Sequence, residues 1–364
     1  MPRDAVASAP GVTAPRIGVL SFAHYHANFW SEVFATRGTL AGIWDDDTAR
    51  GREAAQRFGV ACHDDLDGLL AGCTAVAICS ETSGHPALVE RAAAHGLAIL
   101  TEKPIAASMA DAERIAHAVR QHRTVFMQSF PKRFDPVSHY LKSLVDNRTL
   151  GRLSLVRIRH GHFYGLDPGF RDRWYVQPGL AGGGALLDEG IHGADLLAWL
   201  FGMPESVTAV TSDAALGLAV EDLGVAIYRF ESGLLAELTA SFTFAAADVS
   251  IEFYGSEGTV LVSAVDLASR DITARDFVRI YRRAAGPDGT GLGSSDPERR
   301  WETVPLTPRF KLGEFHQQNA LAFLECLERG TPPPVTLDDG LRALRMIDGA
   351  YRAAATGQRQ DLTR

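Results

Sequence analysis

Cysteine is scarce in this chain of 364 residues, which carries only Cys62, Cys73, Cys79 and Cys326. No two of them form a C-x-x-C pair. A chain of this length can bury a sizeable core without disulfide staples, so we expect small buried thiols in a reducing compartment. At roughly 150 residues per domain, the length predicts two domains.

Long apolar runs are absent as well. No stretch of about 18 apolar residues occurs, so no membrane-spanning helix is expected. Residues 1–15 are rich in Ala, Pro and Ser and lack the apolar segment of a signal peptide. They predict a flexible N-terminal tail, and we expect a cytoplasmic protein.

Positive charge is in deficit, with 36 basic against 44 acidic residues and a formal net charge of −8. Such a chain has no general attraction for nucleic acid or anionic membranes, which leaves a small polar molecule as the expected partner. Only four of the basic residues are lysines: Lys103, Lys132, Lys142 and Lys311. Arginine stays charged, whereas lysine can titrate and acts as a compact donor, so each lysine is a candidate for chemistry.

Short apolar runs alternate with amphipathic stretches over residues 16–135. Strands are predicted at 17–22, 40–44, 75–79, 97–100 and 125–128, and helices at 27–36, 48–58, 86–95 and 109–121. This alternation is typical of an α/β domain with a parallel sheet and crossover helices, as in a Rossmann dinucleotide-binding domain.

The pattern changes over residues 136–364. Strands are predicted at 153–162, 207–211, 225–230, 234–242, 249–254 and 259–262, and helices at 186–201, 314–329 and 338–356, with a Gly- and Ser-rich loop at 287–298. Turn signals between the strands indicate an α+β domain with a large, mostly antiparallel open sheet. We expect it to carry substrate-binding and oligomerisation surfaces, and its last helix to pack back on the first domain.

The first predicted strand leads into Ser21-Phe22-Ala23-His24-Tyr25-His26. A dinucleotide-binding fold carries G-x-G-x-x-G here, and Ser21, Ala23 and His26 stand where the glycines would. Backbone N–H groups at a helix start can still hold a pyrophosphate. As an alternative, His24 and His26 form the H-x-H pair of a metal-dependent hydrolase, in which the two histidines would bind zinc. Such hydrolases fold as an eight-stranded α/β barrel, and the second half of this chain lacks the strand–helix alternation that such a barrel needs.

The second predicted strand ends in Trp44-Asp45-Asp46-Asp47. An Asp at the position of Asp45 typically binds the ribose hydroxyls of NAD. Two further acids would repel a 2′-phosphate, which favours NAD over NADP. The alternative is that Asp46 and Asp47 only precede and cap the next helix.

Two further segments carry chemistry. Glu102-Lys103-Pro104 follows a strand, where open α/β sheets bind ligands. Asp188 and His192 are four residues apart, so a helix would carry both on one face, and a carboxylate beside an imidazole suits a general base. The alternative is an acid near the helix N-terminus and a core histidine. Arg171 and Arg173, beside Trp174, can hold a polar substrate, including an acidic one, or lie in a surface loop.

These segments together resemble the glucose–fructose oxidoreductase/inositol dehydrogenase (Gfo/Idh/MocA) family over about residues 16–360. That family carries E-K-P in its Rossmann domain and G-G-G-x-L-x-D-x-G-x-H in its second domain. Both motifs are present, at residues 102–104 and 182–192. The resemblance implies a Rossmann domain, a second domain with an open sheet, and dimers or tetramers formed through that sheet.

The resemblance also implies roles for single residues. His192 would take the proton from a substrate hydroxyl as hydride leaves for the nicotinamide, Lys103 would donate a hydrogen bond to that oxygen, and Asp188 would hold His192 or the substrate. The implied cofactor-binding residues are Ser21, Phe22, Ala23, His24, His26, Asp45, Cys79, Ser80, Glu81, His85, Glu102 and Lys103. The implied substrate-binding residues are His162, Tyr164, Arg171, Arg173 and Trp174.

Two departures from the family pattern fall on the cofactor side. The glycine turn is lost, and Ser80-Glu81-Thr82-Ser83-Gly84-His85 replaces the usual T-P-N-x-x-H. The expected function is an NAD-dependent oxidoreductase acting on a secondary alcohol or ketone of a sugar, cyclitol or related polyol, with no metal. Alternatives are transient use of NAD for epimerisation, elimination or glycoside cleavage, and a non-catalytic sensor of NAD or sugar.

Overall fold

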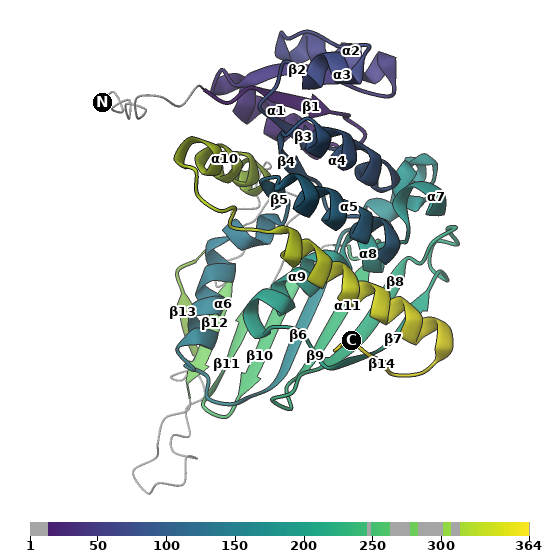
Figure 1. Cartoon of the computed structure of the whole chain (residues 1–364). Coiled ribbons are helices and arrows are strands. Elements are labelled where there is room, and N and C mark those ends of the chain that lie inside the picture. The colour runs from purple at the N-terminus through teal and green to yellow at the C-terminus, as the bar shows by residue number, and fades with distance from the viewer. Residues whose placement is uncertain (1–13, 246–248, 263–276, 283–300, 307–313, 364) are drawn as a thin grey trace, which may run out of the picture. The chain divides into compact units, whose positions relative to one another are not determined.

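The computed structural model describes residues 14–245, 249–262, 277–282, 301–306 and 314–363 (Figure 1). The described chain forms two compact units. The first holds residues up to Glu102 with 113–129 and 316–337, and the second holds the remainder. Most of the predicted tail over 1–15, and all of the predicted loop over 287–298, lie outside the described residues.

The first unit contains a five-stranded parallel sheet in the order β2-β1-β3-β4-β5. Its strands are β1 (Ile17–Leu20), β2 (Leu40–Trp44), β3 (Ala75–Ile78), β4 (Ala98–Thr101) and β5 (Phe126–Gln128). Every residue of β1, β3, β4 and β5 is buried, as in parallel sheets covered on both faces. The predicted α/β domain is confirmed, with strand ends shifted by one or two residues.

The helices of this unit are α1 (His26–Thr36), α2 (Thr48–Phe58), α3 (Leu66–Leu70), α4 (His85–Ala94), α5 (Met109–His122) and α10 (Glu314–Arg329), with a short 3₁₀ turn at Thr82–Gly84. Helix α5 belongs to this unit from Glu113 to its end. The short helix α3 is missing from the sequence prediction. An isolated parallel bridge from Ile43 to Cys62 extends the sheet beyond β2. Strand order reverses beside β1, and such reversals are where open α/β sheets bind ligands.

The second unit contains a nine-stranded sheet in the order β13-β12-β11-β10-β6-β9-β8-β7-β14. Among the described strands of this sheet only β6 and β9 pair in parallel, so the predicted mostly antiparallel sheet is confirmed. Its strands are β6 (Leu153–Gly161), β7 (Ser206–Ser212), β8 (Leu223–Arg229), β9 (Leu235–Ser241), β10 (Val249–Gly255), β11 (Gly258–Val262), β12 (Val278–Arg282), β13 (Trp301–Val304) and β14 (Gln360–Asp361).

The helices of the second unit are α6 (Pro136–Asp146), α7 (Pro178–Ala181), α8 (Ala185–Asp188), α9 (Gly190–Phe201) and α11 (Leu337–Thr356), and 3₁₀ turns occur at Pro131–Phe134, Tyr164–Leu166, Pro168–Asp172 and Trp174–Val176. The last helix, α11, packs on the sheet of its own unit, where Tyr228 donates a hydrogen bond to the carbonyl of Met346. Most of α10 belongs to the first unit, and the expected packing of α11 on the first domain stays a prediction.

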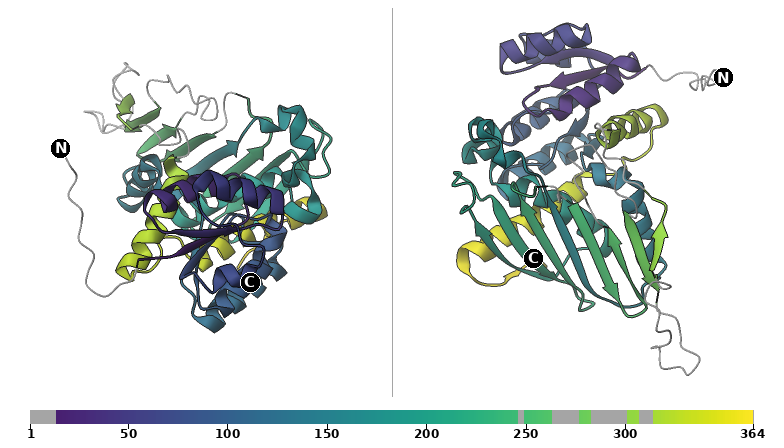
Figure 2. Two further views of the ribbon diagram at one scale, coloured as in Figure 1. Left: turned by 90° about the horizontal axis from the view of Figure 1, so that it is seen from above. Right: turned by 180° about the vertical axis from the view of Figure 1, so that it is seen from behind.

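In the part of this unit that the structure describes, one face of the sheet is covered by helices and the other is open. Helix α11 passes behind the strands in the right panel of Figure 2, and the opposite face of the sheet is turned to the viewer. Gly193 of α9 lies so close to Leu238 of β9 that any side chain would collide. Arg133 donates hydrogen bonds to Asp195 of α9 at 2.6 and 2.8 Å and to Asp339 of α11 at 3.1 Å. This buried network ties both covering helices to the turn that carries Lys132.

The predicted continuous helix over 186–201 is wrong, because the chain breaks at Glu189 between α8 and α9. The N–H of His192 bonds to the carbonyl of Glu189 at 3.2 Å. The carbonyl of Asp188, which an unbroken helix would offer to His192, accepts the Nζ of Lys103 at 2.9 Å. A lysine from a distant segment therefore replaces one intrahelical bond, and Asp188 and His192 do not share one helical face.

Candidate functional site

The loop after β1 keeps the backbone of a glycine turn without its glycine. Ser21 has φ +69°, a left-handed conformation that glycine adopts freely and that costs other residues roughly 1–2 kcal/mol. Its Oγ accepts the N–H of Ala23 at 3.2 Å, and its own N–H bonds to the carbonyl of Trp44 at 2.7 Å. The turn expected of a dinucleotide-binding loop is thus present in conformation although it is absent in sequence.

Asp45 closes this turn from the end of β2. Its carboxylate is buried and accepts the N–H of Phe22 at 2.7 Å and the N–H of Asp47 at 3.0 Å. Arg50 of α2 adds a two-pronged contact, with Nε at 2.9 Å and Nη2 at 2.7 Å. Both oxygens of Asp45 are therefore engaged by the chain itself, and its predicted contact with a ribose stays a prediction.

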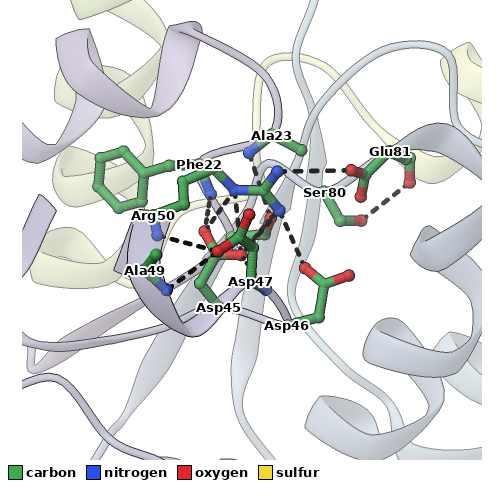
Figure 3. Close-up of polar contacts among 10 residues, drawn as sticks. Phe22, Ala23, Asp45, Asp46, Asp47, Ala49, Arg50, Ser80 and Glu81 are labelled. Carbon is green, nitrogen blue, oxygen red and sulfur yellow. Dashed lines mark hydrogen bonds and ion pairs between the residues drawn. The ribbon is translucent and has the colours of Figure 1, made fainter. Parts of the chain in front are cut away.

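Arg50 lies among several acids, as Figure 3 shows. Besides Asp45 it contacts Asp46 at 3.0 Å and Glu81, which follows β3, at 3.6 Å. Burial raises the pKa of Glu81 and of Asp46, and the nearby Arg50 opposes both shifts. Asp47 accepts the N–H groups of Ala49 and Arg50, so its alternative role as a helix cap is confirmed.

The remaining residues predicted at the cofactor side are largely buried. Ser80 donates its hydroxyl to the carbonyl of Glu81 at 3.0 Å, and His85 is 1% exposed at the start of α4. Burial raises the pKa of the Cys79 thiol well above its usual value, so this cysteine is an inert apolar residue. His24, His26 and Glu102 are buried together and form a separate cluster.

The second unit holds the lysine predicted to be catalytic. Nζ of Lys103 lies 2.5 Å from Oδ1 of Asp188, and both side chains are largely buried. The pair joins the first residue of this unit, just after β4, to the end of α8. Asp188 therefore holds Lys103, which differs from the interpretation that it orients His192.

The carboxylate that does face imidazoles is that of Glu189, which the sequence reasoning missed. Its Oε2 lies 2.9 Å from Nδ1 of His160, and its Oε1 lies 3.9 Å from Nε2 of His162. The His160 ring is 4.9 Å from the ring of His192. The alternation of β6 places His160 on its buried face, and this pattern was the available signal for it.

Electrostatics favour a neutral His192. Burial lowers the pKa of His192 well below its usual value, and the charges of Lys103 and Lys132 add to the effect. Burial and Lys132 also lower the pKa of His160. Burial opposes ionisation of Glu189, but its contact with His160 and the proximity of His162 and Lys103 outweigh burial and hold its pKa well below normal. Near neutral pH, the cluster therefore combines unprotonated His160 and His192 with an ionised Glu189.

Nδ1 of His192, the predicted base, is buried and has no hydrogen-bond partner within the part of the chain that the structure describes. Lys132, unexplained in the sequence, is 4% exposed and acts electrostatically on both His160 and His192. The cluster thus holds two buried lysines out of four in the chain.

The predicted substrate-binding residues divide into two sets. His162 lies beside Glu189 and stacks on Phe242 at 5.2 Å between ring centroids, while Tyr164 packs against His162 at 4.8 Å. In the other set, Arg171 donates to the carbonyls of Leu216 and Gly217, Arg173 lies 4.0 Å from Asp167, and Trp174 stacks on Tyr175 at 4.1 Å. The structure therefore brings His162 and Tyr164 to the Glu189 side of the cluster. It engages Arg171 with a different loop, at residues 216–217, and Arg173 with Asp167 of its own loop.

Fold and site together define a two-domain oxidoreductase with a dinucleotide-binding first domain. The family model for the oxidoreductase family with an NAD-binding Rossmann fold (GFO_IDH_MocA) matches residues 16–130. The model for the GFO/IDH/MocA C-terminal domain matches residues 138–261.

Relatives extend these matches over most of the chain. D-apiose dehydrogenase of Paraburkholderia graminis is 26% identical over 95% of this chain and 88% of the relative. Inositol 2-dehydrogenase of Rhizobium meliloti is 30% identical over 77% of this chain and 78% of the relative. A solved structure of levoglucosan dehydrogenase with NADH and levoglucosan superposes with a TM-score of 0.80 at 21% identity, covering 97% of this chain and 100% of that one.

The chain belongs to the GFO/IDH/MocA family of NAD-dependent oxidoreductases. This confirms the resemblance drawn from the two motifs. Within the described residues, no helix combines the length and apolar character needed to cross a membrane.

Proposed function

We propose that this chain transfers a hydride between NAD and a secondary alcohol or ketone of a sugar, cyclitol or related polyol. The observation that carries the proposal is the buried cluster in which Lys103 lies 2.5 Å from Asp188 and the ring of His192 lies 4.9 Å from that of His160. Relatives named as dehydrogenases of apiose and inositol support a polyol-like substrate.

The proposed chemistry assigns proton transfer to His192 and hydrogen bonding to Lys103, with three further side chains in supporting roles. In the oxidative direction, His192 accepts the hydroxyl proton while the hydride leaves the same carbon with its electron pair. The nicotinamide supplies the two-electron acceptor for that hydride. Lys103 donates a hydrogen bond to the reacting oxygen and stabilises the negative charge that develops there. Asp188 positions the Lys103 ammonium, and Glu189 with His160 sets the electrostatic environment of His192.

The loop after β1 suits a dinucleotide. Its turn at Ser21 has the left-handed backbone of a glycine turn, and it leads into α1 where strand order reverses. The proposal assigns NAD rather than NADP, because Asp45, Asp46 and Glu81 surround Arg50. The three carboxylates outnumber the single guanidinium of Arg50, so the net charge at this place is negative. A 2′-phosphate would be repelled there.

The proposed reaction has two rivals. A family member that uses NAD transiently, for epimerisation, elimination or glycoside cleavage, would need the same base and lysine. A sensor would bind NAD or sugar without turnover, and the buried Lys103–Asp188 pair argues for catalysis instead. Net NADH accumulation separates simple dehydrogenation from both.

The test begins with calorimetry using NAD and NADP in parallel. A panel of inositols, pentoses, hexoses and anhydrosugars then follows, read by nicotinamide absorbance. We expect NAD binding at least tenfold tighter than NADP binding, and NADH formation with some member of the panel. Failure of both nucleotides to bind would refute the proposed function.

We also propose that the chain assembles through the open face of its nine-stranded sheet. Val210 of β7, Ile227 of β8 and Leu235 of β9 lie on that face and are 66%, 48% and 42% exposed. Apolar side chains gathered on one sheet face are a liability in a monomer. A second copy of this chain, offering the same face, would cover them.

A further inference from the structure

Three metal-ligating side chains meet in the first unit, at the carboxyl ends of β1 and β4. They are His24 in the loop after β1, His26 at the start of α1, and Glu102 directly after β4. Each offers one ligand atom, and these atoms all lie within 4.8 Å of one another. The three residues are 3%, 3% and 0% exposed, so the cluster is shielded from water.

The contacts within the cluster are close. Nδ1 of His26 lies 2.7 Å from Oε1 of Glu102, and the rings of His24 and His26 are 4.1 Å apart. Ser129, after β5, donates its hydroxyl to the same Oε1 at 3.3 Å. His316 of α10 packs its ring 3.5 Å from that of His26 and closes the cluster on another side.

Two imidazoles and one carboxylate are a donor set that divalent transition metals prefer, and it recurs in zinc and non-haem iron sites. A divalent ion would bind the Glu102 carboxylate together with both imidazole rings. Ser129 then has the place of an outer hydrogen-bond donor that orients the carboxylate ligand.

We propose that His24, His26 and Glu102 bind a divalent transition metal ion of the zinc type. The ion joins the loop after β1 and the first turn of α1 to the end of β4. The same loop has lost the glycines that pack this turn in dinucleotide-binding folds, and a metal restores the connection by other means. The role is structural, and the proposal does not depend on which substrate the protein uses.

A second group with suitable ligand atoms, His162, Asp188 and Glu189, occurs in the other unit. There the ammonium of Lys103 already lies 2.5 Å from Asp188, and a metal ion would be repelled by it. The two groups therefore differ in a way that an experiment can use.

The test uses full-length protein without a polyhistidine tag. Metal content is measured by mass spectrometry after purification, and the apo protein is titrated with Co²⁺ while visible d–d absorption is recorded. We expect about one metal ion per chain. Co²⁺ should give intense d–d bands that saturate at one equivalent. A wild-type chain that is purified without metal and gives no saturable Co²⁺ spectrum overturns the proposal.

Variants assign the site. His24→Ala, His26→Ala and the isosteric Glu102→Gln should each lose the metal, and the control His63→Asn, which changes a histidine outside the cluster, should retain it. Circular dichroism shows which variants fold. If a histidine variant fails to fold, loss of metal in folded Glu102→Gln still tests the site. Metal retained in folded Glu102→Gln, or lost instead in Asp188→Asn, refutes the assignment.

Discussion

Nζ of Lys103 donates two hydrogen bonds to one residue, Asp188, at 2.5 Å to its carboxylate and 2.9 Å to its carbonyl. The second bond takes the carbonyl that an unbroken helix would give to His192. This one contact therefore fixes the ammonium and separates α8 from α9. It follows that Asp188 acts on Lys103, and that Glu189 is the carboxylate that acts on the histidines.

Replacing Lys103 tests the proposed oxyanion donor. We expect Lys103→Met to lower kcat by at least about 100-fold, the loss typical when a donor to a developing oxyanion is removed. NAD affinity, measured by calorimetry, should change little. Lys142→Met is the matched control, because Lys142 pairs with Asp146 on the surface of α6. Wild-type kcat in Lys103→Met would exclude the assigned role.

Replacing Lys132 should shift the dependence of kcat/KM on pH. Its charge is one of the causes that lower the pKa of His192, so Lys132→Met should raise that pKa. The base must be unprotonated, and kcat/KM falls as pH drops through this pKa. The acidic limb of the kcat/KM profile should therefore move to higher pH. Lys132→Arg, which keeps the charge, should leave the limb near its wild-type place, and an unmoved limb in Lys132→Met contradicts the electrostatic role.

Glu189 should act in the opposite direction. Its negative charge raises the pKa of His192 and favours the protonated form. Glu189→Gln should lower that pKa further, move the acidic limb to lower pH and weaken the base. The measurement is again kcat/KM against pH. If Glu189→Gln moved the limb upward, the assignment of this carboxylate to the histidines would be wrong.

Arg50 should influence cofactor binding through Asp45. Removing the guanidinium in Arg50→Gln deletes charge-assisted hydrogen bonds, worth about 1.5–3 kcal/mol each, that hold Asp45 against the loop of Phe22. We expect NAD affinity to fall by roughly tenfold or more in calorimetry. Arg52→Gln is the control, since Arg52 is exposed and forms an ion pair at 3.6 Å with Asp64, which is also exposed. Equal NAD affinity in both variants would show that Arg50 does not position Asp45.

A charge on the open sheet face should disrupt assembly. Ile227→Glu combined with Val210→Glu places two carboxylates where apolar contact is proposed, and light scattering should show a smaller species. Glu53→Lys, on the exposed side of α2, is the control and should leave the mass unchanged. A wild-type chain that is monomeric at micromolar concentration would refute the proposed interface.

Local patterns predicted the elements of the first unit closely. The ranges of β2 and α2 agree with their predictions residue for residue, because a short apolar run and an acid-capped amphipathic stretch are local signals. Strands β12, β13 and β14 are missing from the sequence prediction, and β14 has only two residues. Their pairing depends on neighbours far along the chain.

The sequence by itself determined the two domains, the family, and the candidate lysine, carboxylate and histidine, since these depend on motif spacing and residue type. Only the tertiary structure decided which side chains contact one another in the site. Lys103 is 85 residues from Asp188, and its contact breaks a helix that propensity alone would continue. His160 of β6 contacts Glu189, which lies between α8 and α9. Arg50 pairs with the carboxylate of Asp45, the residue that the motif predicts to bind a ribose. Hydrogen bonds between distant segments compete with local ones, and only the folded chain shows which are formed.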